Sequence, residues 1–271
     1  MVKRIAVDVF LYLVLLMLYL PIIFIIIYSF SGNARFVFTE FTFSAYAEIF
    51  TSPKTEKLLS SFKNTMLIAS VSSVVSTIMG TFAAIGIFYM GKRTKRLVSN
   101  INQLPIINSE IVMAVSLLLF FNAFHFPNGY LRLFLGHISF CTPYVVLSIM
   151  PKLVQLDQNV YEAALDLGAT PTKALFSVMF PLITPGIVSG FVMAFTLSMD
   201  DFIITQINKG TMTGIDTLST YIYTDAGKGG LQPFWLAVFS IIFVLVLAVL
   251  LFINLKKATK KEADKRKILN A

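Results

Sequence analysis

The sequence predicts an all-helical integral membrane protein with six membrane-spanning helices and both termini on the cytoplasmic side. Of its 271 residues, 56% are hydrophobic and 13% are charged, a balance far more apolar than a soluble domain requires. The apolar residues form six blocks, each long enough to supply the roughly 20 helical residues that cross a bilayer core. The Lys and Arg residues concentrate in alternate connecting segments, which sets the orientation. We expect residues 1–271 to form a single transmembrane domain.

The six expected spans follow the apolar blocks in chain order. The first block is longer than the apolar core of a signal peptide, which is roughly 7–15 residues, and no small-residue cleavage site follows it. We therefore expect it to be retained as a membrane anchor. The blocks cover about 5–28, 66–90, 97–124, 131–150, 182–207 and 234–255.

Basic residues decide the expected orientation, because Lys and Arg are retained on the cytoplasmic side of a membrane. The connection at residues 91–96 carries four basic residues and no acid. Lys3 and Arg4 precede the first block, and a basic tail at 256–267 follows the last. The membrane orientation thus accounts for the net charge of +8. The basic tail is suited to contact with anionic lipid. It requires no nucleic-acid partner.

The inner four blocks differ from the first and the last, which are nearly continuous Leu, Ile, Val and Phe. Ser, Thr, Gly and Pro recur in the inner blocks, and such residues let helices approach closely or line water. We expect the inner blocks to form the working bundle and the other two to surround it. Cys141 is the single cysteine, so an intrachain disulfide is impossible. His125 and His137 supply too few ligands for a metal site, and neither receives a role.

Three carboxylates in the expected spans, Glu110, Asp200 and Asp201, are candidates for a solute pathway. A charged side chain inside a membrane costs several kcal/mol unless it meets water or a partner. No Lys or Arg within the spans is expected to pair with Glu110, so the acids indicate a cavity that receives a cationic solute. Protonation on burial and a countercharge from a partner subunit are the alternatives. Asp200 and Asp201 could also lie solvated at the outer membrane interface.

The connection between the fourth and fifth blocks, residues 153–181, is polar and favours helix. Asn159, with Glu162 three residues later, predicts a helix N-cap with an acidic N3 residue. Gly168 predicts the end of that helix in a left-handed turn.

A second short helix is expected directly after this turn. Thr170 is a suitable cap with Pro171 at the first helical position, and Pro181 is expected to interrupt the helix at the membrane. Two short helices joined by a glycine would form a compact cytoplasmic protrusion. Such a protrusion indicates a docking surface, although a helical hairpin without a partner is the alternative.

This connection resembles the cytoplasmic motif of the membrane subunits of binding-protein-dependent ABC importers. The residues that carry the resemblance are Glu162-Ala163-Ala164, Gly168 and Pro181. The family pattern has Ile and Leu where this chain has Val178 and Phe180. Further stretches, which begin at Glu110, His137 and Ala194, are similar to the spermidine and putrescine permeases of that family. Together with the protrusion, they cover roughly residues 105–205.

The resemblance implies a MetI-like permease fold in a bacterial plasma membrane and ATP-driven import of polyamines by alternating access. It implies three partners: a cytoplasmic ABC ATPase dimer, a second homologous permease and an extracytoplasmic polyamine-binding protein. The coupling residues to the ATPase would be Glu162, Ala163, Ala164, Gly168 and Pro181. The sequence has no Gly-x-x-x-x-Gly-Lys-Ser/Thr loop, so ATP is expected to be hydrolysed by the partner. This chain is therefore expected to be no enzyme and to bind no cofactor.

The same residues bear on three other functions. An importer subunit for iron, an inorganic anion or another small solute would share this framework, although the acids argue against an anion. A passive cation channel could use the acids but has no need of the protrusion. An intramembrane aspartyl protease needs two Asp residues that face each other. The adjacent Asp200 and Asp201 would instead point about 100° apart on a helix.

Overall fold

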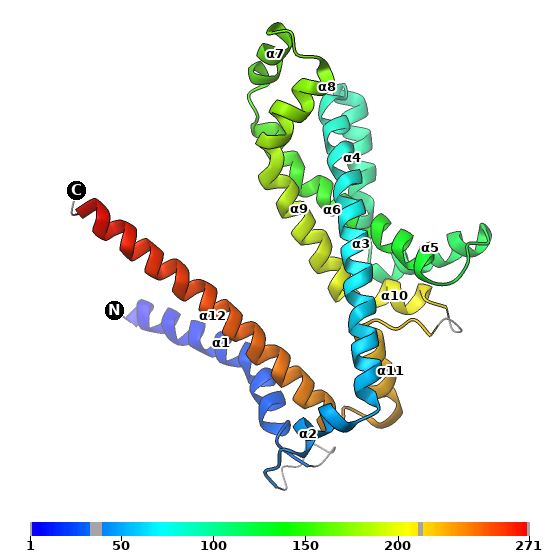
Figure 1. The fold of residues 1–271 in the computed structure, drawn as a ribbon, viewed down its shortest axis with the longest axis vertical. Coiled ribbons are helices and arrows are strands. Elements are labelled where there is room, and N and C mark those ends of the chain that lie inside the picture. Colours follow the sequence, from blue (N-terminus) through cyan, green and yellow to red (C-terminus); the bar gives the residue numbers. More distant parts are fainter. Residues whose placement is uncertain (1, 33–39, 211–213, 270–271) are drawn as a thin grey trace. The chain divides into compact units, whose positions relative to one another are not determined.

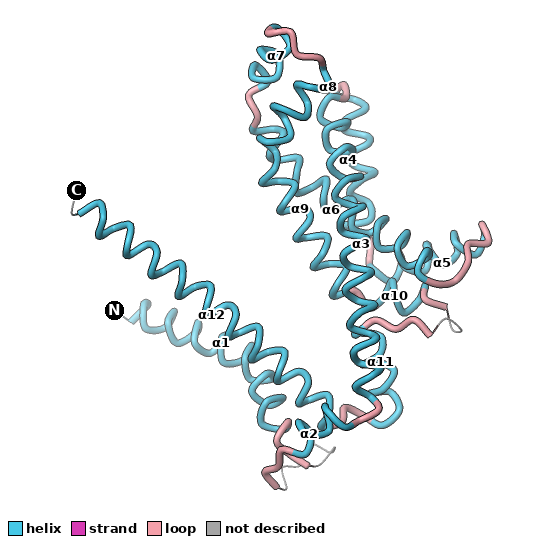
Figure 2. The backbone as a smooth tube through the Cα atoms, viewed as in Figure 1, coloured by secondary structure: helices cyan, strands magenta, loops and turns pink. Residues whose placement is uncertain are grey.

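The computed structural model describes residues 2–32, 40–210 and 214–269 (Figure 1). Over these ranges the chain is helical, and Figure 2 shows the helices joined by loops. The one β-type pairing in the described ranges is an isolated bridge between Ser31 and Phe41. The all-helical expectation is therefore confirmed. The side chains of Lys3 and Arg4, and of the basic tail after Lys256, lie outside the described residues.

The chain divides into two compact units. The first comprises Met1–Lys57 and Ile222–Ala271, and the second comprises Leu58–Tyr221. Both candidate sites from the sequence fall in the second unit. The expectation of a single domain and the expectation that the outer spans surround the bundle stay predictions.

In the first unit, α1 (Val2–Tyr28) and α12 (Pro233–Leu269) run side by side, and the two chain ends lie at the same end of this pair (Figure 1). The short helix α2 (Ser44–Thr51) packs against α12. From Val7 onward, α1 exposes nearly all of its large apolar side chains. An apolar helix of this length with no buried face suits contact with lipid.

A partly buried ion pair fixes the start of α12 within the first unit. The Asp225 carboxylate accepts hydrogen bonds from Lys54 Nζ at 2.8 Å and from Trp235 Nε1 at 2.7 Å. Burial alone would raise the pKa of the Asp225 carboxyl. The hydrogen bonds from Lys54 and Trp235, with the charge of Lys54, outweigh burial and hold this pKa below its ordinary value. The carboxylate is therefore ionised and paired at neutral pH.

The second unit holds helices α4–α10 and η1 with α3 from Leu58 onward, while α11 crosses its boundary at Tyr221. Within it, α6 and α9 share the largest contact. Its core is built from the inward faces of α3, α6 and α9, and includes Val145, Ile149 and Ile183. The helices with their bounds are α3 (Lys54–Tyr89), α4 (Lys92–Ile107), α5 (Glu110–Ala123), α6 (Tyr130–Gln155), α7 (Gln158–Asp166), α8 (Pro171–Ala174), the π-helical segment η1 (Leu175–Met179), α9 (Phe180–Asp200), α10 (Ile203–Asn208) and α11 (Leu218–Gly229).

Glycines allow the helices of this unit to pack closely, as the small residues of the inner blocks predicted. A Cβ at Gly190 of α9 would stand 3.0 Å from Val145 Cγ1, and one at Gly186 would stand 3.3 Å from the Ile149 Cα. On α3, a Cβ at Gly80 would stand 2.7 Å from Val145 Cβ. Val145 is therefore enclosed by glycines from two neighbouring helices. Such close backbone approach is a main source of stability between helices in lipid.

The expected third span is two helices and not one. Residues 97–124 divide between α4 and α5, whose axes differ by 106°. The break falls at Asn108 and Ser109, which are both extended, and the Ser109 hydroxyl accepts a hydrogen bond from Val112 N–H as the cap of α5. The cause is local, because Asn and Ser side chains compete for backbone hydrogen bonds and favour helix ends.

The expected fifth span, residues 182–207, is displaced toward the N-terminus. The helix runs through α8, η1 and α9 from Pro171 to Asp200, and Asp201 ends it. Residues 203–208 form the separate helix α10. By length and composition, four helices of the described chain can cross a membrane, the bent α4–α5 pair supplies a fifth crossing, and Pro233–Ala248 is a shorter apolar helix. Six spans with cytoplasmic termini fit this pattern, and the orientation stays a prediction.

We predict that Gly80→Ala lowers the stability of the second unit. The added Cβ would stand 2.7 Å from Val145 and 3.2 Å from the Thr142 carbonyl oxygen, and overpacking of this kind costs about 1–3 kcal/mol. The matched control is Gly86→Ala on the same helix, where a Cβ meets no atom within 4 Å. Because Ala favours helix over Gly by up to about 1 kcal/mol, the control should be neutral or stabilising. Thermal unfolding of the purified protein in detergent measures both, and equal unfolding temperatures would contradict the prediction.

Candidate functional site

The first candidate site is the turn between α7 and α8, and the cap of α7 is not the expected residue. Asn159 was predicted to cap this helix, but α7 begins at Gln158 and the Asp157 side chain accepts the capping hydrogen bond from Asn159 N–H at 3.0 Å. Asp157 is an equally good capping residue placed two positions earlier. Glu162 therefore lies in the middle of α7, exposed, and not at its third position.

Gly168 ends α7 in the left-handed conformation that the sequence predicted. Its φ is +85°. Its N–H donates to the Leu165 carbonyl at 2.9 Å, and Ala169 N–H donates to the Ala164 carbonyl at 3.0 Å. These two bonds form a Schellman motif, which satisfies the last carbonyls of the helix. A Cβ at Gly168 would meet no atom within 4 Å, so the backbone conformation, and not space, requires glycine here.

The start of the next helix is as expected, but its end is not. Thr170 caps α8, with Pro171 at the first position and the Thr170 hydroxyl accepting from Lys173 N–H. Pro181 was expected to interrupt this helix, yet the helix continues past it. The π-helical segment Leu175–Met179 directly precedes Pro181. A wider turn accommodates the missing N–H of proline and relieves the clash of its ring with the carbonyl four residues earlier.

One face of α7 packs inward and the other is open. On the inner face, the Tyr161 ring lies 6.0 Å from that of Tyr89 at the end of α3, beside a small cavity of about 60 Å³. Leu167, just after the helix, is 89% exposed and Val160 is 44% exposed. Glu162 and Ala163 are also exposed, and Val160 and Glu162 also line the cavity. We call these four exposed residues, Val160, Glu162, Ala163 and Leu167, the coupling surface.

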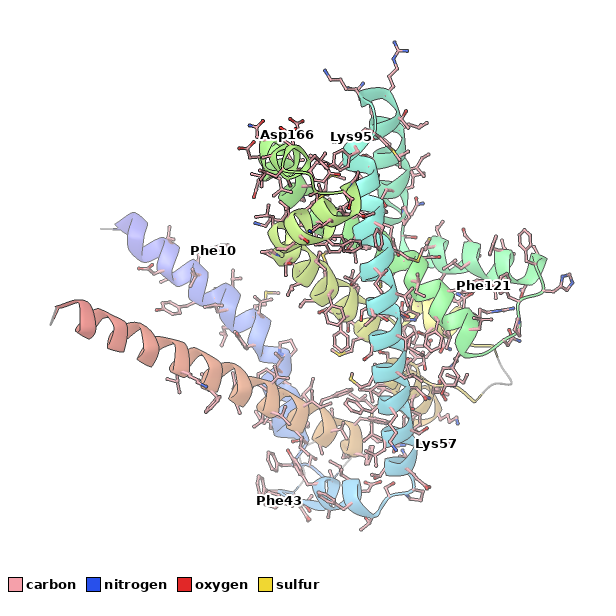
Figure 3. All side chains as sticks on the ribbon, turned by 45° about the horizontal axis from the view of Figure 1, so that its top comes forward. Phe10, Phe43, Lys57, Lys95, Phe121 and Asp166 are labelled. Atoms are coloured by element: carbon pink, nitrogen blue, oxygen red, sulfur yellow. The ribbon has the colours of Figure 1, made fainter. Side chains whose placement is uncertain are left out.

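The coupling surface lies at the end of the second unit that also carries the basic connection after α3. Figure 3 shows Asp166 of α7 and Lys95 of α4 at this same end. The sequence assigned both segments to the cytoplasmic side from charge alone. Their placement together fits that orientation.

The second candidate site contains the three acids, which occupy different environments. Asp201 is buried between α9 and α10. Its Oδ1 accepts from Ile204 N–H at 3.1 Å, and its Oδ2 accepts from Thr205 N–H at 2.9 Å and from the Thr205 hydroxyl at 2.8 Å. The carboxylate therefore serves as the cap of α10. Its place in a solute pathway stays a prediction.

Asp200 and Glu110 are exposed on the second unit. Asp200 is the last residue of α9, and Glu110 is the first residue of α5. The N-terminal position of Glu110 is favourable because a helix start carries partial positive charge. No salt bridge to either acid occurs among the described residues. They are the two acids of this site that a solute could reach, and their role also stays a prediction.

Arg132 lies at the N-terminal end of the expected fourth span, so this span does contain a cation. It is buried in the first turn of α6, where it donates to the Phe126 carbonyl at 2.6 Å and lies over the Phe121 ring. It forms no ion pair with Glu110 in the described structure. Arg132 therefore supports the turn between α5 and α6 and leaves the exposed acids uncompensated.

His137, which received no role from the sequence, is fully buried beside Asp201. Its Nδ1 lies 2.7 Å from the Ser198 hydroxyl of α9, and its Nε2 lies 3.0 Å from the Thr205 hydroxyl of α10 and 3.5 Å from Asp201 Oδ2. One imidazole thus joins three helices. No group of three or more potential metal ligands occurs among the described residues.

Comparisons with known proteins agree with this arrangement. A family model described as binding-protein-dependent transport system inner membrane component matches residues 76–261. The putrescine transport system permease protein PotI of Escherichia coli K12 is 32% identical over 220 residues, which are 78% of this chain and 76% of PotI. The spermidine/putrescine transport system permease protein PotC of Haemophilus influenzae is 31% identical over 249 residues, which are 92% of this chain and 95% of PotC.

Solved structures share the fold at low sequence identity. A bacterial ABC transporter for the acidic polysaccharide alginate contains a chain with a TM-score of 0.73 and 17% identity, which covers 93% of this chain and 95% of that chain. The alginate transporter in complex with its periplasmic protein gives a TM-score of 0.66 at 20% identity, with 92% and 94% coverage. The expected permease fold is therefore confirmed.

Proposed function

The chain belongs to the family of inner membrane components of binding-protein-dependent transport systems, and we propose that it carries polyamines as the permease subunit of an ATP-driven importer. The observation that carries the proposal is the pair of exposed acids, Asp200 and Glu110, without a salt bridge among the described residues. A polyamine is an elongated polycation, which two uncompensated carboxylates attract. The names of the related putrescine and spermidine permeases support the same solute class.

The coupling surface supports a cytoplasmic ABC ATPase dimer as the source of energy. A side chain as large and as apolar as Leu167 at 89% exposure gains stability when a partner covers it. The ATPase binds and hydrolyses ATP, and this chain supplies neither catalytic residues nor a cofactor. Glu162, Ala163 and Ala164 form the helix that docks, while Gly168 sets the direction of the chain that leaves it. Pro181 marks the point at which the docked segment enters the membrane.

The transport cycle follows from these two sites. A polyamine-binding protein delivers the solute on the extracytoplasmic face of the bacterial inner membrane. This chain and a second homologous permease enclose the pathway, which opens alternately to each side. Closure of the ATPase dimer moves the docked α7 and, through α8 and η1, the helix α9 that carries Asp200.

Two alternatives differ in the solute or in the source of energy. A permease for iron, an inorganic anion or another small solute would use the same coupling surface, although exposed acids are unfavourable for an anion. A passive cation channel would use the acids but would gain nothing from the exposed α7. Solute uptake that requires ATP separates the importer from the channel.

We predict that Gly168→Val abolishes coupling of transport to ATP hydrolysis. A β-branched residue at φ +85° is strained, since the left-handed conformation costs non-glycine residues about 1–2 kcal/mol or more. The turn should therefore lose its geometry, and ATP-dependent uptake by the complete importer should fall at least about tenfold, the factor that roughly 1.4 kcal/mol represents. Gly168→Asn, which tolerates this conformation, should retain most of the uptake.

The matched control for this prediction is Gly91→Ala, because Gly91 caps α4 at φ −61° and also faces open space. This variant should transport as the natural protein does. Uptake of labelled polyamine and ATPase activity of the membrane-bound complex measure the effect. Normal coupled uptake by Gly168→Val would contradict the proposal.

We further predict that neutralising the exposed acids weakens solute capture. Glu110→Gln and Asp200→Asn should each raise the apparent KM for polyamine uptake by about tenfold, the effect expected from loss of one charge interaction of about 1–2 kcal/mol. Assembly of the complex should be unchanged. Asp201→Ala should differ, because loss of a buried helix cap lowers stability by about 1 kcal/mol.

The control for the acids is Glu48→Gln, which removes an exposed acid from α2 in the first unit. It should leave the apparent KM unchanged. Initial uptake rates over a range of polyamine concentrations give the comparison. An unchanged KM in both Glu110→Gln and Asp200→Asn would exclude these acids from the pathway.

A further inference from the structure

We propose that α10 is a cross-brace that holds the two exposed acids, Asp200 and Glu110, at a fixed separation, with His137 and Asn208 as its positioning residues. The inference rests on the proposed function, because it concerns how the pathway acids are held. It adds a structural determinant of which polyamine the permease prefers.

One end of α10 is attached to α6 and α9 through buried hydrogen bonds. His137 Nε2 bonds to the Thr205 hydroxyl, which itself donates to Asp201 Oδ2. His137 Nδ1 bonds to Ser198. His137 and Thr205 are fully buried, and Ser198 and Asp201 are nearly so. Buried hydrogen bonds in a medium of low polarity hold their partners firmly, since breaking them leaves polar groups unpaired. Asp200 directly precedes this attachment.

The other end of α10 is attached to α5. Asn208 is fully buried, and its Nδ2 donates to the Ala114 carbonyl at 3.1 Å as well as to the Ile204 carbonyl at 3.0 Å. Ala114 lies four residues, about one helical turn, after Glu110. Helix α5 also packs more extensively on α10 than on α6. The position of Glu110 is therefore set largely by α10.

A fixed separation between two carboxylates discriminates among polyamines. These solutes differ in the number of methylene groups between their amines. Two amines of one polyamine can therefore each lie close to a carboxylate, while a polyamine with another spacing brings only one amine close to a carboxylate. The attraction between unit charges falls with distance. A change in the position of α10 should alter the uptake of two polyamines unequally.

The first test compares two amides at position 137 in the complete importer. A Gln carboxamide reaches about as far as His Nε2 and keeps the bond to Thr205 of α10. An Asn carboxamide reaches about as far as His Nδ1 and keeps only the bond to Ser198. The ratio of the Vmax/KM values for spermidine and putrescine should stay the same in His137→Gln. In His137→Asn it should change by about threefold or more, the effect of one lost hydrogen bond.

The second test is Asn208→Leu, a change of similar size that removes the bond to α5. The Asn208 Oδ1 atom is buried and has no hydrogen-bond partner in the described structure, so Leu also removes an unsatisfied acceptor. A purely structural role predicts equal or higher stability with unchanged selectivity. The brace predicts a spermidine-to-putrescine ratio shifted by about threefold or more, with the coupled ATPase activity retained.

A distance measurement tests the brace without the use of any transported solute. Spin labels at cysteines substituted for the exposed Ile111 and Met199, which neighbour the two acids, report their separation in the assembled complex. The distance distribution should be narrow in the natural background and in His137→Gln, and should broaden or shift in Asn208→Leu and His137→Asn. An unchanged distribution with an unchanged uptake ratio in these two variants would overturn the brace.

The outcome also separates the brace from the proposed function. If the unsubstituted importer carries neither spermidine nor putrescine, the polyamine proposal fails while the label distances still decide the brace. If His137→Gln and His137→Asn lose assembly equally, His137 is a structural residue only and the brace is wrong.

Discussion

The continuous helix from Pro171 to Asp200 is the constraint on which the rest of this structure depends. At 1.5 Å per residue, its 30 residues span about 45 Å, enough to join a turn on one side of a bilayer to the opposite side. Its continuity past Pro181 relies on the π-helical segment Leu175–Met179. A break at that proline would separate the coupling surface from the exposed acid. The unbroken helix instead makes the two sites parts of one mechanical element.

The packing of this helix holds it in place against α6 and α10, as the proposed transmission of movement requires. Gly186 and Gly190 bring its backbone close to α6, so the two helices share their surfaces over most of their length. At its C-terminal end, the buried cluster of His137, Asp201 and Thr205 replaces apolar packing with directed hydrogen bonds. Under the proposed coupling, movement at Gly168 would reach α10 through contacts that are either close-packed or hydrogen-bonded.

The sequence predicted the parts of this structure that depend on local chemistry or on broad composition. Apolar blocks identified the membrane helices, Gly168 identified a left-handed turn, and Thr170 with Pro171 identified a helix start. Each follows from one residue or one window, with little influence from tertiary contacts. The Glu-Ala-Ala pattern indicated a helix at Glu162 for the same reason, and α7 forms there.

Features that depend on distant partners or on competition between neighbours were missed. Proline usually ends a helix, yet at Pro181 a wider turn upstream accommodates it. Asp157, and not the predicted Asn159, provides the cap of α7. Asn108 and Ser109 divide the third predicted span into two helices, although its composition predicted one continuous helix. His137 received no role because its partners, Ser198 and Thr205, lie more than 60 residues away in the chain. Its neighbours in sequence, which include Ser139, Cys141 and Thr142, were the one local indication of a polar interior.

The most direct test of the rigid link is the structure of the assembled importer by electron cryo-microscopy, without nucleotide and with ATP trapped on the ATPase. A rigid link predicts that residues 171–200 remain one helix in both states, with the π-helical turn before Pro181 retained, while the helix as a whole moves relative to α3. Unwinding or a new bend between Leu175 and Pro181 in either state would contradict it, because movement of the coupling surface would then not reach Asp200.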